Sequence, residues 1–141
     1  IKVGASSEVE LKEKKDRVED AMCATKAAIK EGIVPGGGIA LLNASTYIKP
    51  SNDNEQVLLE AIKAPYLTIL KNAGLEVVYP KGKGKGINVV TGKDVNMIKS
   101  GIIDPLLVTK SALKNAASVA TTILSTDCVI NNLRVEDESN R

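Results

Sequence analysis

The sequence predicts a mainly α-helical fold, on three observations. Apolar residues recur at three- and four-residue spacing in several segments, which is the spacing of one helix face. Residues that begin and end helices flank these segments, and runs of β-type residues are short. A chain of 141 residues with 43% hydrophobic residues and a net charge of +2 is also typical of one globular domain with a buried core.

The first long helix is predicted to begin at a capping box. Ser7 is followed by Glu10, a pair that satisfies free N–H groups at a helix start. The residues before it, Ile1 to Ala5, favour a short strand. The charged residues of the first turns are typical of a solvated face. Gly32 is a suitable residue for the end of this helix.

This helix is predicted to carry one apolar stripe, with a single carboxylate on the opposite side. The stripe consists of Val18, Met22, Thr25 and Ile29, flanked by Ala21 and Ala28. Asp20 falls opposite, with Ala24 and Ala27, whose short side chains leave its carboxylate open to a docking group. A lone carboxylate on a polar helix face is usually only solvated, so Asp20 by itself does not establish a site.

Three consecutive glycines, Gly36 to Gly38, lead from this helix into the next apolar segment. The first N–H groups of a helix have no internal partner and carry partial positive charge, and glycine allows a ligand to approach the backbone closely. This arrangement predicts a phosphate or ribose contact. A turn between two antiparallel helices would explain the glycines equally well, because the pattern is not the GxxxxGK[ST] phosphate loop.

Further helices are predicted over residues 38–48 and 57–72. Between them, residues 49–54 have the composition of a loop. Pro65 lies inside the second segment and should begin a new turn or kink the helix. Gly74 should end it.

A β-hairpin is predicted next, because β-branched residues lie on both sides of Thr91-Gly92. Its strands are expected over residues 87–90 and 93–95. The preceding segment, residues 81–86, alternates lysine with glycine and is predicted to be a flexible, solvated loop without an assigned role.

The longest helix is predicted over residues 106–124, with Asp104 as its N-cap and Pro105 in its first position. After it, residues 128–133 have the character of a single strand that needs a partner edge. The charged residues 134–141 are predicted to be a disordered tail.

Missing residue types exclude several classes of site and partner. Without histidine, the chain can form no Ser-His-Asp or Cys-His nucleophilic site and no imidazole metal site. Cys23 and Cys128 follow no metal-binding or disulfide pattern and are expected to be free, packed thiols in a reducing compartment. The scarcity of aromatic residues and the small net charge predict no nucleic-acid partner. No apolar run of about 18 residues and no signal-peptide pattern are present, so no membrane partner is predicted either.

Several segments together resemble the group I chaperonins, in the part that joins the intermediate and equatorial domains. The resemblance is carried in order by RVEDAMCATKAAIKEGIVPGGGIALL, APYLTILKNAG, INVVTGKDVNMIKSGIIDPLLVTKSAL and ASVATTILSTDCVI, and so covers essentially the whole chain. It implies a helical bundle like a chaperonin equatorial domain, with a short hairpin and edge strands. Residues 1–31 would belong to the intermediate, hinge domain and residues 32–133 to the equatorial, ATP-binding domain.

The resemblance also implies an activity and a set of partners. Group I chaperonins are ATP-driven protein-folding machines that assemble as a double heptameric ring, bind unfolded proteins and work with a co-chaperonin of about 10 kDa. The chain would be roughly the last quarter of a subunit, inactive as an ATPase by itself. The expected location is the bacterial cytoplasm or, alternatively, a mitochondrial or plastid matrix.

Site residues follow from the same resemblance. Asp20 would orient or activate the water that attacks the γ-phosphate of ATP, and Gly37 would contact the ribose or the nucleotide through its backbone. Asn88, Val89 and Val90 would contact the adenine, and Asp104 would accept from the ribose hydroxyls. Mg²⁺ would be held mainly by residues upstream of Ile1, so no metal site is expected in this chain.

Two departures from the family pattern leave a different class of function open. Val89 stands where the family usually has a smaller residue, and the regions 43–64 and 74–87 each look short by one or two turns. Extra methyl groups in a tight pocket cost about 1 to 3 kcal/mol when the surroundings cannot relax. The alternative is a non-enzymatic helical assembly module that joins a larger complex, and nucleotide binding by the full-length protein would discriminate the two.

Overall fold

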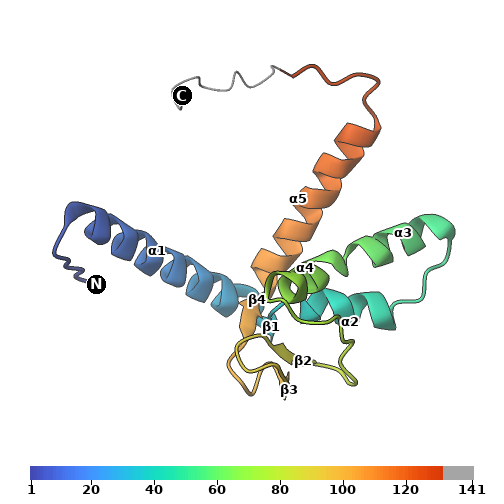
Figure 1. Cartoon of the computed structure of the whole chain (residues 1–141). Coiled ribbons are helices and arrows are strands. Elements are labelled where there is room, and N and C mark those ends of the chain that lie inside the picture. The colour runs from blue at the N-terminus through green and yellow to red at the C-terminus, as the bar shows by residue number, and fades with distance from the viewer. Residues whose placement is uncertain (132–141) are drawn as a thin grey trace, which may run out of the picture.

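The computed structural model describes residues 1–131, which form a small packed junction with two long helices projecting from it (Figure 1). The helices are α1 (Glu8–Glu31), α2 (Ile39–Tyr47), α3 (Asp53–Ala61), α4 (Ala64–Asn72) and α5 (Leu106–Leu124). The strands are β1 (Ile33–Pro35), β2 (Lys85–Asn88), β3 (Lys93–Asn96) and β4 (Ile103–Pro105). The predicted mainly helical fold is confirmed, and the predicted tail lies outside the described residues.

The helix start predicted at Ser7 is confirmed, although the Glu10 half of the capping box reaches one residue further back, to Ser6. The Ser7 hydroxyl accepts from the backbone N–H of Glu10 at 3.3 Å, and the Glu10 carboxylate accepts from the Ser6 N–H at 3.1 Å. The helix ends at Glu31, where Gly32 adopts φ 88° and donates its N–H to Ala28. The strand predicted over residues 1–5 is wrong, because no strand among the described residues pairs with this segment.

The apolar stripe predicted for α1 is left mostly uncovered by the described chain. Met22 and Ile29 keep 43% and 81% of their surface exposed, and no residue of α1 is buried. The half-buried positions of its C-terminal half are instead Ala24, Ala27, Ala28 and Glu31. This helix contacts the rest of the described chain at β4 and α5, so small residues near its C-terminal end are the ones that pack. The periodicity indicated a helix correctly but not which side would be covered.

Strands β1 and β4 pair antiparallel and join two segments that are far apart in the sequence. Val34 lies opposite Asp104, Ile33 opposite Pro105 and Pro35 opposite Ile103. The pairing places the end of α1 beside the start of α5. Neither strand was predicted, because three residues that include a proline carry no recognisable alternating pattern.

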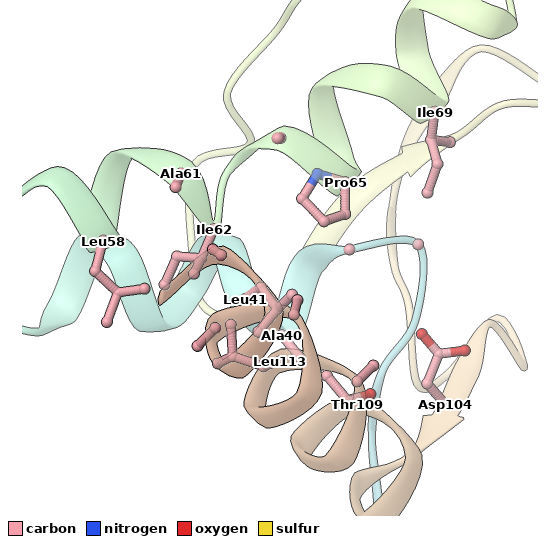
Figure 2. A pocket seen from close by; sticks show the side chains of 17 residues that line it. Ala40, Leu41, Leu58, Ala61, Ile62, Pro65, Ile69, Asp104, Thr109 and Leu113 are labelled. Carbon is pink, nitrogen blue, oxygen red and sulfur yellow. The ribbon is translucent and has the colours of Figure 1, made fainter. Parts of the chain in front are cut away.

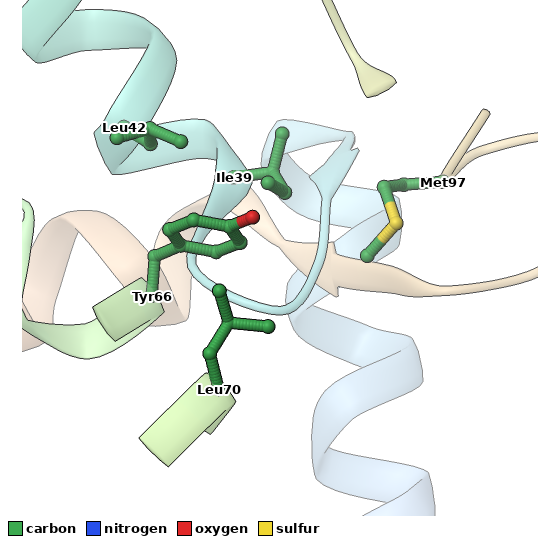
Figure 3. Packing of buried hydrophobic residues seen from close by; sticks show 5 residues of the cluster. All are labelled: Ile39, Leu42, Tyr66, Leu70 and Met97. Atoms are coloured by element: carbon green, nitrogen blue, oxygen red, sulfur yellow. The ribbon is translucent and has the colours of Figure 1, made fainter. Parts of the chain in front are cut away.

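Helices α2 to α4 follow the prediction closely and enclose the core. The break between α3 and α4 falls at Ile62-Lys63, and Pro65 occupies the first turn of α4, where its missing N–H costs no helix bond. Figure 3 shows the buried cluster from these helices and the segment after β3, made up of Ile39, Leu42, Tyr66, Leu70 and Met97. The Tyr66 hydroxyl donates to the Val78 carbonyl at 2.6 Å, which fixes the segment after α4 against this core.

Two of the three consecutive glycines are required by close packing. A Cβ atom on Gly38 would lie 2.7 Å from the backbone nitrogen of Tyr66, and Gly38 has φ 77°. A Cβ atom on Gly36 would lie 3.1 Å from the backbone nitrogen of Ile103. The glycines therefore serve the junction structurally, bringing α2 against α4 and β4, in addition to any contact with a ligand.

The β2–β3 hairpin is confirmed, with shifted bounds. Lys85 and Gly86, predicted as loop, belong to β2, whereas Val89 and Val90 lie in the turn. Gly86 packs so closely on Ile39 that an added Cβ would come within 2.7 Å of it, which ties the hairpin to the core.

Three predictions at the C-terminal end are wrong. Asp104 does not cap α5: it is a strand residue of β4, and Pro105 occupies the N-cap position without a side-chain bond. The 24-residue α1, not the 19-residue α5, is the longest described helix. Residues 128–131 form no strand, and 132–133 lie outside the described residues. Strand pairing with β1 takes Asp104 out of the cap position.

Candidate functional site

A cavity of about 710 Å³ separates α5 from helices α2, α3 and α4 (Figure 2). Its walls are almost entirely apolar. On the α5 side they are made by small residues one turn apart, among them Ala112, Ala116 and Ala120, and on the other side by Leu41, Leu58, Ile62 and Ile69. An almost entirely apolar lining suits an apolar occupant over most of the length of the cavity.

Polar groups lie on the lining only at a few positions. Among the lining residues, Asp104 and Thr109 carry the polar side chains, and Gly37 and Gly38 contribute backbone. Figure 2 shows the Asp104 carboxylate at the edge of the cavity, directed toward the loop that leads into α2. The structure therefore brings together two of the predicted site residues, Gly37 and Asp104, on one surface.

The start of α2 offers hydrogen-bond donors to this region. Ile39 donates to the Gly36 carbonyl at 3.2 Å and Leu42 to the Gly38 carbonyl at 3.1 Å. Within residues 1–131, the N–H groups of Ala40 and Leu41 donate to no backbone carbonyl, and both residues line the cavity. Unpaired N–H groups at a helix start favour an anion or a ligand oxygen.

Asp104 is held in place by the β1–β4 pairing, opposite Val34, and is half-buried. Burial raises the pKa of its carboxyl group above the ordinary value of 3.8, because a charged carboxylate loses solvation there. A partly desolvated carboxylate is a strong acceptor for hydroxyl groups. Asp104 and the free N–H groups, all on residues of the same lining, can together hold a ligand that carries both hydroxyls and negative charge.

The residues predicted to contact adenine lie elsewhere, in the turn of the β2–β3 hairpin. Asn88, Val89 and Val90 are not on the lining of the cavity. The Asn88 side-chain oxygen accepts from the Val90 N–H at 3.0 Å and so stabilises the turn. Val90 is 90% exposed. Their assignment to adenine stays a prediction.

Asp20 also lies away from the cavity, exposed on α1. It is on the same face of the helix as Ala24 and Ala27, which are half-buried. Asp20 therefore lies on the face of α1 that is partly covered further along, near the C-terminal end of the helix. Its catalytic assignment stays a prediction, because the structure does not bring its carboxylate to Gly37 or Asp104.

Thr109 and the free N–H groups of Ala40 and Leu41 were not singled out from the sequence. Thr109 is the fourth residue of α5, and its hydroxyl donates to the Pro105 carbonyl at 3.4 Å. Its position five residues after Asp104 would have indicated a site residue only if the strand pairing of Asp104 had been known.

No metal site and no membrane-spanning helix occur in residues 1–131. No three or more acidic, cysteine or histidine side chains gather there in a way that could hold a metal ion. No helix in that range has both the length and the hydrophobicity needed to cross a bilayer. Cys23 and Cys128 are both free, as expected, but exposed rather than packed.

Comparison with known proteins agrees with this architecture. The sequence model of the TCP-1/cpn60 chaperonin family matches residues 1–134. The chain is also similar to a group III chaperonin, solved in the open state, at 27% identity and a TM-score of 0.79. That alignment covers 91% of this chain and 30% of the group III chain.

The chain therefore belongs to the TCP-1/cpn60 chaperonin family, and the resemblance read from its sequence is confirmed. Its fold is that of part of a chaperonin, mainly helical with small hairpins. Because it spans about 30% of the length of the chaperonin it matches, the activity of a whole subunit is a matter for proposal.

Proposed function

We propose that this chain is the C-terminal part of a group I chaperonin subunit that binds and hydrolyses ATP to drive protein folding in a ring oligomer. One observation supports it most: Gly37, Asp104 and the two α2 residues with free N–H groups line the same cavity, in a chain that belongs to a chaperonin family. This set combines donors for an anion with an acceptor for hydroxyls, as a nucleotide requires.

Each group has a distinct role in this proposal. Gly37, with φ 65° and no side chain, lets the nucleotide approach the backbone, and Asp104 accepts from the ribose hydroxyls. The hairpin turn of Asn88, Val89 and Val90 lies against the adenine, with the valines supplying apolar contact. Val89 is 40% exposed and so has surface available for that contact.

Asp20 is the proposed catalytic residue. Its carboxylate would orient or activate the attacking water once α1 turns its Asp20 side toward the nucleotide. In the present arrangement the carboxylate is exposed and apart from Gly37 and Asp104. Hydrolysis in this proposal therefore depends on a change in the direction of α1.

Mg²⁺, which neutralises phosphate charge in phosphoryl transfer, would be held by residues other than those described here. The described residues do not form a cluster of acidic side chains that fits a metal ion. The isolated chain is accordingly expected to show no ATP turnover. Measurable turnover by the purified chain that is lost on Asp20→Ala would contradict these roles.

The decisive experiment uses Asp20→Ala in the complete subunit. If Asp20 acts on the water, hydrolysis should fall by about 10² to 10⁴, the range for loss of a general base, while ATP affinity stays unchanged. Single-turnover hydrolysis and equilibrium nucleotide binding measure the two quantities separately. Equal losses of binding and rate would show that Asp20 is structural.

The partners proposed are those of a chaperonin ring: further copies of the subunit, a co-chaperonin and unfolded proteins, in the bacterial cytoplasm or an organellar matrix. The apolar cavity wall and the uncovered long helices are consistent with extensive contacts to other chain segments or subunits.

The same uncovered surfaces favour one alternative, a non-enzymatic helical assembly module. Val119, Ile123 and Leu124 at the end of α5 are 59%, 60% and 86% exposed. A complete protein that assembles with partners but shows no saturable binding of ATP or ADP would support this alternative and exclude the nucleotide site.

A further inference from the structure

A second, smaller groove of about 300 Å³ lies at the C-terminal end of α2. It shares no lining residue with the cavity between α5 and the other helices. Three segments form its walls: the last turns of α2, the residue before α4 and the segment that follows α4. The lining includes Asn43, Thr46, Tyr47, Lys63, Tyr79 and Pro80. The groove is therefore separate from the proposed nucleotide site.

The core fixes the shape of this groove. Leu42, which also lines it, is 4% exposed and belongs to the buried cluster of Figure 3. The Tyr66 hydroxyl donates to the Val78 carbonyl at 2.6 Å and so holds the wall formed by Tyr79 and Pro80. A groove that is already formed loses little conformational entropy when a ligand enters.

Exposed aromatic side chains are concentrated at the groove. The chain has three tyrosines and no phenylalanine or tryptophan, and two of the three, Tyr47 and Tyr79, are on the lining. They are 60% and 56% exposed, and neither hydroxyl is hydrogen-bonded to a described residue. An exposed tyrosine combines apolar surface with a free hydroxyl, which is typical of a binding anchor. Grooves lined by aromatic residues also suit proline-containing segments.

Two polar side chains give the groove a preference for carboxylates and peptide groups. The Lys63 side chain is 23% exposed, and its ammonium donates to Glu60 at 2.7 Å, which leaves two further donors. None of the described lining residues is acidic. The amide of the half-buried Asn43 has no hydrogen bond within residues 1–131 and can both donate to and accept from a peptide group.

We propose that this groove binds a short, extended peptide segment of a partner protein that carries an acidic residue next to proline. The carboxylate of the segment pairs with Lys63, and its proline packs on Tyr47 and Tyr79. One of its backbone amides pairs with the Asn43 side chain. A volume of about 300 Å³ is at the lower end of known ligand pockets and limits the bound segment to a few residues.

The segment after α4 favours a peptide over a small organic acid. In the described part of the chain, the backbone N–H groups of Tyr79, Lys81 and Gly82 donate to no acceptor. An extended peptide can accept hydrogen bonds along such a segment, whereas a small acid reaches it at one point only. Lys81 and Lys83 add positive charge next to the lining, which increases the rate of association with an acidic partner.

The test measures binding of a fluorescein-labelled peptide, Pro-Glu-Pro-Pro with blocked ends, to the complete subunit by fluorescence anisotropy. The matched control peptide carries glutamine in place of glutamate. The acidic peptide should bind about one-and-a-half- to fivefold more tightly at low salt, and this difference should shrink as salt is added. No nucleotide is present, so the result does not depend on the proposed function.

Two variants and one control separate the contributions to binding. Tyr79→Ala should weaken binding of both peptides about five- to thirtyfold, the range for loss of an aromatic anchor. Lys63→Met should weaken only the acidic peptide, about one-and-a-half- to fivefold, to the affinity of the control peptide. Lys71→Met removes an exposed lysine of α4 outside the lining and should change neither affinity. Tyr79 is exposed, so its truncation should leave the helical circular dichroism signal unchanged.

The location is checked with the same peptide carrying a benzophenone group, which is cross-linked by light and mapped by mass spectrometry. Cross-links should fall on residues 43–47 or 79–82. Cross-links found only elsewhere in the subunit would overturn the proposal, as would equal affinities of the parent for the two peptides. Binding that neither Tyr79→Ala nor Lys63→Met weakens would overturn it as well.

Discussion

The junction and the two long helices differ sharply in how far their side chains are buried. Ile39, Tyr66 and Leu70 at the junction are at most 2% exposed, whereas neither α1 nor α5 contains a single buried residue. The junction is closed by contacts between segments distant in the sequence, such as β1 with β4 and Gly38 with Tyr66. Most of the length of each long helix meets solvent in the described part.

The junction is thus stabilised by contacts within the chain, whereas the two long helices require another surface to cover their apolar residues. A helix without buried residues gains little from hydrophobic burial and relies on its own hydrogen bonds and caps. The proposed ribose-binding carboxylate of Asp104 belongs to the closed junction, while the proposed catalytic carboxylate of Asp20 is on a free arm. Binding groups held rigidly and a catalytic group carried on a movable helix would allow ATP to bind before hydrolysis begins.

The largest effect on the free energy of unfolding is expected from truncating a leucine of the core. The same truncation at the end of a projecting helix is its comparison. Leu70→Ala should lower the free energy of unfolding by about 2 to 5 kcal/mol, because Leu70 is fully buried and a cavity remains. Leu124→Ala should change it by less than about 0.5 kcal/mol, since Leu124 is 86% exposed. Urea denaturation followed by circular dichroism measures both. Similar costs for the two variants would remove the distinction between junction and arms.

An effect of similar size is expected from adding one methyl group within the glycine run. In Gly38→Ala, the new Cβ would meet the Tyr66 backbone at 2.7 Å in a residue with positive φ. Overpacking of about 1 to 3 kcal/mol and left-handed strain of about 1 to 2 kcal/mol together predict a loss of about 2 to 5 kcal/mol.

The matched control for this change is Gly74→Ala. Gly74 has a similar φ of 68°, but nothing lies within 4 Å of its would-be Cβ, so only the strain of about 1 to 2 kcal/mol applies. The tyrosine near-ultraviolet circular dichroism signal, to which the buried Tyr66 contributes, should weaken in Gly38→Ala and persist in Gly74→Ala. Equal destabilisation of the two variants would mean that close packing at Gly38 is not the constraint.

The smallest effect is expected in the pH dependence of stability at Asp104. Burial raises the pKa of this carboxyl in the folded chain, so the folded state binds more protons than the unfolded state at pH values between 3.8 and the raised value. Its contribution to the free energy of unfolding therefore falls as pH rises through that window. Asp104→Asn should remove this decline and be at least as stable as the parent at pH 7.

Urea titrations at a series of pH values from about 4 to 7 compare parent and variant directly. The difference between the two curves isolates the carboxyl from all other titrating groups. A variant that is less stable than the parent at every pH would indicate that the Asp104 carboxylate makes a structural bond, as the helix cap expected from the sequence would have done.

Helix locations could be predicted from the sequence because their signals are local. The Ser7–Glu10 capping box, the break at Pro65 and the stop at Gly74 each act within one or two turns, and the structure confirms them. The family could also be recognised, since the order of several motifs survives in the sequence even where individual residues differ.

Contacts between distant segments could not be predicted in this way. The same Asp-Pro sequence that typically begins a helix places Asp104 in a strand here, because β1 lies alongside and pairs with it. The apolar stripe of α1 is visible in the sequence, but no distant segment of the described chain covers it, so Met22 and Ile29 are exposed. In both cases a partner distant in the sequence, present or absent, decided the outcome.

The sequence by itself thus determined the helices, their ends, the hairpin and the family, all of which depend on short-range hydrogen bonding and on residue order. Only the tertiary structure decided that Gly37 and Asp104 share one cavity edge, and that Glu31 and Lys110 pair across the junction. The physical reason is that helix caps and turns are formed by neighbouring residues, whereas a site or an ion pair between elements exists only after β1 and β4 have brought those elements together.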